Sequence, residues 1–192
     1  MRVYCATSNP GKLREFTLGL KESVNVEAIP GLNSITPPEE TGSTFEENAV
    51  QKALFYAEFC DGIVFAEDSG LEVDSLAGAP GVYSARFAGL DATDQDNNRL
   101  LLEKLAGVVE RGARFVSVVA LANGAGLLHT FRGVVEGRIL EAPRGENGFG
   151  YDPLFYYPPF GCSFGEAALE AKMQVSHRGQ ALARMLAFLQ TA

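Results

Sequence analysis

The sequence predicts an α/β protein with a mixed, elongated central sheet that is flanked by helices. Strand-like apolar segments alternate with helical segments in the first half of the chain, which is typical of parallel strands joined by helices. In the second half, Arg114–Ala122 and Leu127–Val135 are predicted to be strands joined by a hairpin turn at Asn123–Gly126. Parallel and hairpin-connected strands together indicate a mixed sheet. No repeat or linker divides the sequence, so we expect a single domain over residues 1–192.

The first elements are predicted from apolar runs and helix-capping signals. Val3–Ala6 is predicted to be a strand, and Lys12 to about Leu20 a helix. Thr44 and Glu47 have the spacing of a capping box, which predicts a helix from there to about Phe59. Pro37–Gly42, before that helix, is the most irregular segment and is expected to be a loop at the edge of a cleft.

The later elements follow from the same reasoning. Ile63–Ala66 and Glu72–Ser75 are predicted to be two strands separated by a turn at Ser69-Gly70. Thr93 is expected to open another helix, and Arg138–Glu141 to extend or add a strand. Ser176 is predicted to cap a last helix, whose apolar stripe consists of Leu182, Met185, Leu186 and Leu189.

Charge and composition exclude several classes of protein. The net charge of −8 argues against general nucleic-acid binding, which requires a basic surface, but it allows a small polyanion in a local basic pocket. The apolar runs are too short to span a bilayer, and the N-terminal segment lacks the pattern of a secretory signal, so we expect no membrane association. Cys5, Cys60 and Cys162 are odd in number and far apart, which fits neither a disulfide framework nor a zinc site. A reducing cytoplasm is therefore the expected location.

An acidic segment follows the apolar run Ile63–Ala66. Four carboxylates, from Glu67, Asp68, Glu72 and Asp74, lie within eight residues. Ligand sites of α/β proteins collect at the ends of buried strands, and hard oxygen ligands placed there suit Mg²⁺. A solvated polar loop is the competing interpretation.

Three separate segments supply candidate phosphate-binding groups. Thr7–Lys12 lies between a strand and a helix, where free backbone N–H groups and the positive end of a helix favour phosphate. Lys52 lies on the capped helix beside small alanines that permit close approach, and Arg86 follows a Gly/Pro loop. A tight Asn-Pro-Gly turn with a surface lysine remains the alternative for the first segment.

Two further segments are candidates for binding a nucleobase. Gly148–Pro153 places Phe149 and Tyr151 between glycines that permit close approach, so either ring could stack on a base. Core aromatic residues in a glycine-rich turn are an equally good explanation. His177 and Arg178 begin the last helix and could donate hydrogen bonds to a carbonyl-bearing base.

Taken together, these segments closely resemble the inosine triphosphate pyrophosphatase family of non-canonical purine nucleotide pyrophosphatases. The matching motifs occur in the family order and span nearly the whole chain. They are Ala6–Lys12, Glu39–Gly42 with Thr44–Ala49, Glu67–Asp74, Gly78–Arg86, Gly148–Pro153 and Ser176–Gly179. Three positions depart from the usual family pattern, namely Ser8, Glu67 and the segment Ala171-Lys172-Met173.

The resemblance implies two lobes around a nucleotide cleft, a homodimer, and Mg²⁺-dependent cleavage of ITP, dITP and XTP to the monophosphate and pyrophosphate. It implies that Glu39 and Asp68 bind the metal and that Asp68 is also the proton acceptor. Whether Glu39 or Glu40 is the metal ligand stays open. By motif position, the implied substrate contacts are Thr7, Ser8, Asn9, Pro10, Gly11, Lys12, Lys52, Ser69, Arg86, Phe149, Gly150, Tyr151, Asp152, Lys172, His177 and Arg178.

Two other functions stay open at this stage. A nucleotide-binding sensor would use the same pocket without hydrolysis, but the clustered acids argue against it. A related pyrophosphatase could act on modified pyrimidine nucleotides, but Phe149 and the segment Ser176–Arg178 favour purines. A 6-oxo group would accept hydrogen bonds from Arg178 or from backbone N–H groups, whereas the amino group of adenine would leave those donors unpaired.

Overall fold

A computed structural model describes residues 2–20 and 24–191 of the chain. It confirms the predicted fold class, because seven strands form a mixed sheet in the order β2-β1-β3-β4-β5-β6-β7 with helices packed against it. The described residues divide into two compact units, of which the first comprises residues 2–20, 24–68, 117–133 and 177–191. The second comprises Ser69–Val116 and Val134–Ser176. No helix in the described part of the chain combines the length and the apolar character needed to cross a bilayer.

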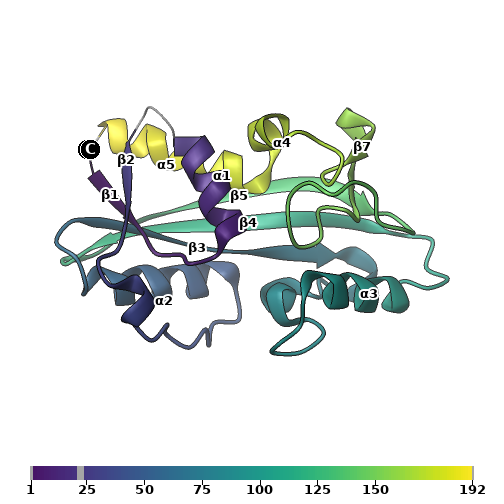
Figure 1. Cartoon of the computed structure of the whole chain (residues 1–192), viewed down its shortest axis with the longest axis horizontal. Helices are drawn as coiled ribbons and strands as arrows, with labels where there is room; N and C mark the ends of the chain where they lie inside the picture. The colour runs from purple at the N-terminus through teal and green to yellow at the C-terminus, as the bar shows by residue number, and fades with distance from the viewer. Residues whose placement is uncertain (1, 21–23, 192) are drawn as a thin grey trace. The chain divides into compact units, whose positions relative to one another are not determined.

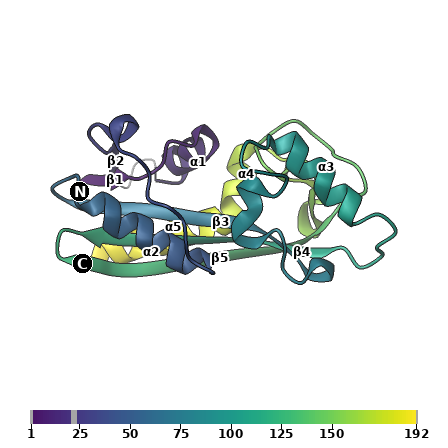
Figure 2. The same ribbon diagram turned by 90° about the horizontal axis from the view of Figure 1, so that it is seen from below.

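The first unit begins with parallel strands. β1 (Arg2–Cys5) pairs in parallel with β2 (Asn25–Ala28) on one side and with β3 (Ile63–Val73) on the other. The helices of this unit are α1 (Pro10–Leu20), α2 (Phe45–Ala57) and α5 (His177–Thr191). Figure 1 shows α1 and α5 side by side on one face of these strands and α2 on the other face. The same arrangement is seen from the α2 side in Figure 2.

Local capping signals explain where two helices begin. The Thr44 hydroxyl accepts from the Glu47 N–H, and the Glu47 carboxylate accepts from the Thr44 N–H, which confirms the predicted capping box of α2. Thr93 and Asp96 form the equivalent box at α3 (Asp94–Lys104). Each box satisfies backbone donors that a helix terminus otherwise leaves without partners.

The prediction of a turn at Ser69-Gly70 is wrong. β3 runs without interruption from Ile63 to Val73, and the acidic residues Glu67 and Asp68 lie inside the strand. A glycine can adopt the extended backbone of a strand, so the buried Gly70 does not force a turn. Asp74, predicted to lie in a second strand, instead begins the 3₁₀ helix Asp74–Leu76.

The hairpin prediction is confirmed. β4 (Gly112–Asn123) and β5 (Gly126–Ile139) are long strands joined at Gly124 and Ala125. The predicted continuation near Arg138 is the end of β5. The chain passes from one unit to the other within β3, β4 and β5, and again between Ser176 and His177.

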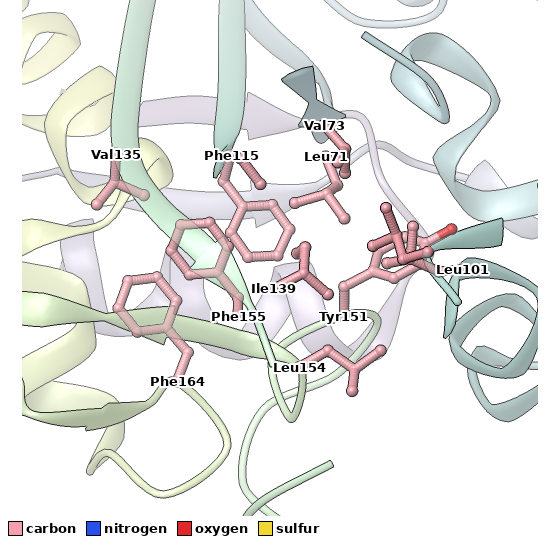
Figure 3. Close-up of a cluster of buried hydrophobic side chains, with 12 residues drawn as sticks. Leu71, Val73, Leu101, Phe115, Val135, Ile139, Tyr151, Leu154, Phe155 and Phe164 are labelled. Atoms are coloured by element: carbon pink, nitrogen blue, oxygen red, sulfur yellow. The ribbon is translucent and has the colours of Figure 1, made fainter. Parts of the chain in front are cut away.

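The second unit completes the sheet with two short antiparallel strands. β6 (Phe155–Tyr157) pairs with β5 and with β7 (Cys162–Ser163). Its other elements are α3, α4 (Leu169–Val175) and the 3₁₀ helices Gly81–Arg86 and Pro158–Phe160. Its core includes Leu71, Leu101, Ile139 and Leu154, with the neighbouring rings of Phe115, Phe155 and Phe164 (Figure 3).

Candidate functional site

The loop between β1 and α1 has the geometry that was predicted for a phosphate-binding segment. Pro10 is the first residue of α1, a position where its missing N–H costs nothing. The Asn9 side-chain oxygen accepts from the Lys12 N–H at 3.0 Å, and the Asn9 N–H donates to the Thr7 hydroxyl at 3.2 Å. Ser8 and Asn9 are exposed, and Gly11 is buried. The exposed residues of this loop therefore lie at the N-terminal end of α1, where the helix dipole is positive.

Lys12 belongs to a buried network of two cations and two carboxylates. The Lys12 ammonium lies 2.7 Å from Oε2 of Glu67, whose side chain is fully buried on β3. Oε1 of the same carboxylate accepts from Nε of Arg178 at 3.0 Å and from the Ser117 hydroxyl at 2.8 Å. The Arg178 guanidinium also donates to Glu15 on α1. This network ties α1, β3 and α5 together.

The electrostatics of Glu67 follow from its partners. Burial opposes ionisation of the carboxyl, but the nearby charges of Arg178 and Lys12 outweigh that penalty and hold the pKa of Glu67 well below its usual range. Two carboxylates and two cations leave this network neutral. Arg178, which was predicted to contact the base, is 2% exposed. A base carbonyl would have to share a guanidinium that two carboxylates already bind.

A second network surrounds Asp68. The Lys52 ammonium, presented by α2, donates to Oδ1 of Asp68 at 2.9 Å and to Oε1 of Glu40 at 2.6 Å. The amide of Asn48, also on α2, donates to Oδ2 of Asp68 at 3.3 Å and accepts from the Gly42 N–H at 2.8 Å. One cation thus faces two carboxylates, and this network carries a net charge of −1.

The two ionisable partners respond differently to this arrangement. Burial raises the pKa of Asp68 above its ordinary value against the pull of Lys52 and Lys12, and the neighbouring Glu40 carboxylate adds a smaller upward effect. Burial disfavours the Lys52 ammonium, but Asp68 and Glu40 together outweigh it and raise the pKa of Lys52. Lys52 is therefore firmly charged at neutral pH, and Asp68 is a stronger base than an exposed aspartate.

The donor set around Asp68 fits a Mg²⁺ ion that substrate helps to bind. Among the described residues, no group of three or more His, Cys, Asp or Glu side chains forms a complete metal cage. Mg²⁺ commonly takes only one or two carboxylates and completes its shell with water and substrate phosphates. The excess carboxylate charge of the Asp68 network favours such a cation.

The two glutamates before α2 differ in their surroundings. The Glu40 carboxylate is bound to Lys52, as described above. Glu39 is exposed, and its backbone carbonyl accepts from the Gln51 amide at 2.8 Å. The Glu39 carboxylate is therefore outside the Asp68 network, and its predicted role as a metal ligand stays a prediction.

The second unit contains the predicted base-binding loop. Oδ2 of Asp152 accepts from the Phe149 N–H at 3.0 Å and from the Lys172 ammonium at 2.5 Å. The same ammonium lies 5.4 Å from the centroid of the Phe149 ring. Lys172 is thus brought together with Phe149 and with Asp152, which lies 20 residues earlier in the sequence.

Tyr151 and Phe149 differ in what they offer a ligand. Tyr151 is 4% exposed, its ring packs in the core of the second unit (Figure 3), and its hydroxyl donates to the Ser84 carbonyl at 2.8 Å. Burial raises the pKa of this phenol. Phe149 is half-buried and keeps an accessible surface, so the stacking prediction rests on Phe149.

The remaining predicted contacts lie on separate elements. Ser69 lies in β3 and is half-buried. Arg86 ends the 3₁₀ helix Gly81–Arg86, and its guanidinium lies 5.3 Å from the centroid of the exposed Tyr83 ring. His177 is buried at the start of α5. Cys5 is excluded as a nucleophile, because burial raises the pKa of its thiol to about 12.

Sequence reasoning missed three polar residues of the networks. Glu15 is 1% exposed, although a charged residue on an amphipathic helix normally faces solvent. Asn48 is fully buried against Asp68, although a polar residue on a helix is normally exposed to solvent. Ser117 has no distinguishing signal in an apolar strand. For Glu15, the one available signal was its position three residues after Lys12, on the same face of α1.

Comparison with known proteins assigns the chain to a family. A model of the Ham1 family matches residues 3–188. A protein of an Exiguobacterium species named dITP/XTP pyrophosphatase is 50% identical to this chain, and the match covers 96% of this chain and 95% of the relative. The relative of the same name in Deinococcus radiodurans is 51% identical and covers 97% of this chain and 92% of its own.

Solved structures give the same result. The Ham1 protein of Staphylococcus aureus is 40% identical, with a TM-score of 0.89 over 100% of this chain and 99% of its own. A protein of Mycobacterium abscessus described as a nucleoside-triphosphatase and dITP/XTP pyrophosphatase is 38% identical, with a TM-score of 0.76 over 98% of this chain and 100% of its own. The family that the sequence motifs resemble is thereby confirmed. The chain belongs to the Ham1 family.

Proposed function

We propose that this protein hydrolyses the non-canonical purine nucleotides ITP, dITP and XTP to the monophosphate and pyrophosphate in a Mg²⁺-dependent reaction. One observation supports this above the others, namely the single Lys52 ammonium held between the carboxylates of Asp68 and Glu40. The arrangement supplies a buried base and a cation, with an excess of negative charge that favours a divalent metal. The relatives named dITP/XTP pyrophosphatase support the choice of substrate.

Asp68 acts in this proposal as the proton acceptor for the attacking water. Its raised pKa makes it a better base than an exposed aspartate, and the Asn48 amide and Lys52 ammonium fix its orientation. Lys12 and Lys52 offset charge on the α-phosphate and on the leaving pyrophosphate. Arg86 and Ser69 are the proposed phosphate or sugar contacts of the second unit.

Glu39 and Asp68 are the proposed metal carboxylates. Glu40 already balances the charge of Lys52, whereas the Glu39 carboxylate is exposed and lies outside that network. When bound, Mg²⁺ would neutralise phosphate charge and lower the pKa of the nucleophilic water. The loop Thr7–Lys12 would bind phosphate oxygens through its backbone at the start of α1.

Base selection rests on hydrogen-bond donors. Arg178 is bound by Glu67 and Glu15, so a base carbonyl would have to share its guanidinium or accept from backbone N–H groups. Phe149 is the proposed stacking ring, with Gly150, Tyr151, Asp152, Lys172 and His177 around the base. A 6-oxo group would accept from such donors, whereas adenine presents an amino group there and leaves a buried donor unpaired.

The proposal extends to assembly and location. A homodimer is proposed from the family resemblance, with a single two-lobed domain in each subunit. The net charge of −8 supports a small-molecule substrate over nucleic acid. Three cysteines that form no disulfide, together with a nucleotide substrate, support a cytoplasmic location.

One assay tests the proposed function and separates it from the two alternatives. The purified protein is incubated with Mg²⁺ and ITP, XTP, GTP, ATP or dUTP, and pyrophosphate and orthophosphate are both measured. Pyrophosphate from ITP and XTP in excess over ATP is expected. Binding without product would indicate a sensor, preference for dUTP a pyrimidine enzyme, and orthophosphate a different hydrolase. Equal efficiency with ATP and ITP would contradict the account of base selection.

A further inference from the structure

Helix α3 binds both of the peptide groups that flank Gly150. The Gly150 N–H donates to Oδ2 of Asp94 at 2.6 Å, and the Gly150 carbonyl accepts from the Asn98 side-chain amide at 2.9 Å. Asp94 and Asn98 are four residues apart on α3, so they project from the same face of the helix. Gly150 has a φ of +61°, a left-handed conformation that other residues rarely adopt. Two side chains of one helix thus hold the peptide groups on both sides of a residue with an unusual backbone conformation.

The residues on either side of Gly150 are fixed by other groups. On one side, Phe149 donates its N–H to the Asp152 carboxylate, which Lys172 also binds. Gly148 has a φ of +78°, and a Cβ there would lie 2.0 Å from Oδ2 of Asp152, so any side chain would displace the Asp152 carboxylate. On the other side, the Tyr151 hydroxyl is bonded to the Ser84 carbonyl. Within this segment, Tyr151 and Asp152 are buried, whereas Gly148, Phe149 and Gly150 keep appreciable exposure.

The hydrogen bonds to α3 therefore control the part of the loop that can meet a ligand. The Phe149 ring is attached one residue before the Gly150 N–H that Asp94 binds. Asp94 holds the peptide group between Phe149 and Gly150, and Asn98 holds the next one, between Gly150 and Tyr151. Together they restrict the backbone that carries the Phe149 ring, although no sequence motif places either residue among the substrate contacts.

We propose that Asp94 and Asn98 are positioning residues that fix the two peptide groups flanking Gly150 and thereby set the selectivity of the loop for the purine base. This inference rests on the proposed function, because it takes Phe149 as the base-stacking ring. A loop that is fixed before binding holds the Phe149 ring, and the Asp152–Lys172 pair bonded to the Phe149 N–H, in one arrangement and does not adjust to adenine. Loosening the loop should weaken discrimination more than it slows turnover.

Asp94 has a second role that the experiment must separate from the first. It is the first residue of α3, where a negative charge also stabilises the helix N-terminus. Asp94→Ala removes both the charge and the acceptor. Asp94→Asn removes the charge but keeps a side-chain oxygen that can accept from the Gly150 N–H. Asn98→Ala removes the donor to the Gly150 carbonyl and leaves the N-terminus of α3 unchanged.

Two measurements on the full-length protein test the proposal. The first is hydrogen exchange of the Gly150 amide, which does not depend on activity. The second is the ratio of kcat/KM for ITP to that for ATP. We expect faster exchange and a ratio lower by on the order of 10-fold in Asp94→Ala and Asn98→Ala, mainly through KM for ITP. Asp94→Asn should restore both toward wild type. The matched control Asp91→Ala removes an exposed carboxylate three residues earlier and should change neither.

The outcomes are distinct. Unchanged exchange at Gly150 in Asp94→Ala would overturn the proposal, as would faster exchange with an unchanged ratio. An Asp94→Asn variant that behaves like Asp94→Ala would assign the effect to the charge at the helix terminus and would also overturn it. A wild-type protein that releases no pyrophosphate from ITP would refute the proposed function and, with it, the selectivity role. The exchange data would still show whether Asp94 fixes the loop.

Discussion

The Lys52 ammonium donates a hydrogen bond to the Asp68 carboxylate across 2.9 Å, from helix α2 to strand β3. Both side chains are largely buried, so the interaction is screened little by water. The Glu40 carboxylate shares the same ammonium, which leaves Asp68 only part of the compensating charge. A carboxylate in this environment is well placed to accept a proton, and the predictions below begin with it.

Replacing Asp68 should abolish most of the activity without unfolding the protein. Asp68→Asn keeps the shape of the side chain but removes the basic oxygen, so kcat/KM for ITP should fall on the order of 10²–10⁴-fold. Steady-state pyrophosphate release measures the effect, and circular dichroism checks the fold. Glu72→Gln is the matched control, because Glu72 lies on the same strand and pairs with Arg114 at 3.5 Å instead of with Lys52. A Glu72→Gln variant as impaired as Asp68→Asn would contradict the assignment of Asp68.

Glu39 and Glu40 should be separable by their dependence on Mg²⁺. Glu39→Gln should raise the Mg²⁺ concentration needed for half-maximal activity by about 10-fold or more, because it removes a proposed metal ligand. Glu40→Gln should change that concentration less, since its carboxylate chiefly balances Lys52. A titration of activity against Mg²⁺ at saturating ITP measures both. The opposite ranking would transfer the metal role to Glu40.

The buried carboxylate of Glu67 should stabilise the fold in a pH-dependent way. Its pKa is lowered on folding, so its contribution is fully present above the ordinary value of 4.5 and is lost as the pH falls below it. Glu67→Gln leaves Arg178 and Lys12 without this partner and should cost about 3–5 kcal/mol of unfolding free energy at pH 7. Urea unfolding at several pH values should show the difference from wild type shrinking below pH 4.5. A difference that grows on acidification would contradict this, and the exposed Glu103→Gln serves as control.

A glycine in β5 should tolerate no side chain. A Cβ added at Gly133 would lie 1.9 Å from the backbone carbonyl oxygen of His177, so the strand and the start of α5 would have to separate. Gly133→Ala should lower the unfolding free energy by about 1–3 kcal/mol. Gly124→Ala, at the hairpin turn with nothing within 4 Å, is the control for backbone effects of the same substitution. Equal midpoints of thermal unfolding for the two variants would contradict the close approach.

The sequence predicts the parts of the fold that depend on near neighbours. Thr44 and Glu47 are three residues apart, and both partners of the capping box are visible in the sequence. The turn predicted at Ser69-Gly70 failed because that rule weighs local conformational preference alone, whereas pairing and burial decide the path of β3. The strand has buried residues along most of its length, which outweighs a single glycine.

Most residues of the candidate site could be predicted from the sequence, but the contacts between them could not. Lys12, Lys52 and Asp68 were identified as candidates, yet their partners come from remote parts of the chain. Arg178 and Glu15 are 163 residues apart, and no local pattern shows that they pair. Tyr151 and Phe149 are equivalent in a sequence motif, and only the packed core distinguishes the buried ring from the accessible one.

The position of bond cleavage tests the central claim most directly. ITP is hydrolysed in H₂¹⁸O with Mg²⁺ under single-turnover conditions, and both products are analysed by mass spectrometry. If water activated by Asp68 attacks the α-phosphorus, ¹⁸O enters inosine monophosphate and the pyrophosphate stays unlabelled. Label in pyrophosphate, or release of orthophosphate with inosine diphosphate, would contradict the account.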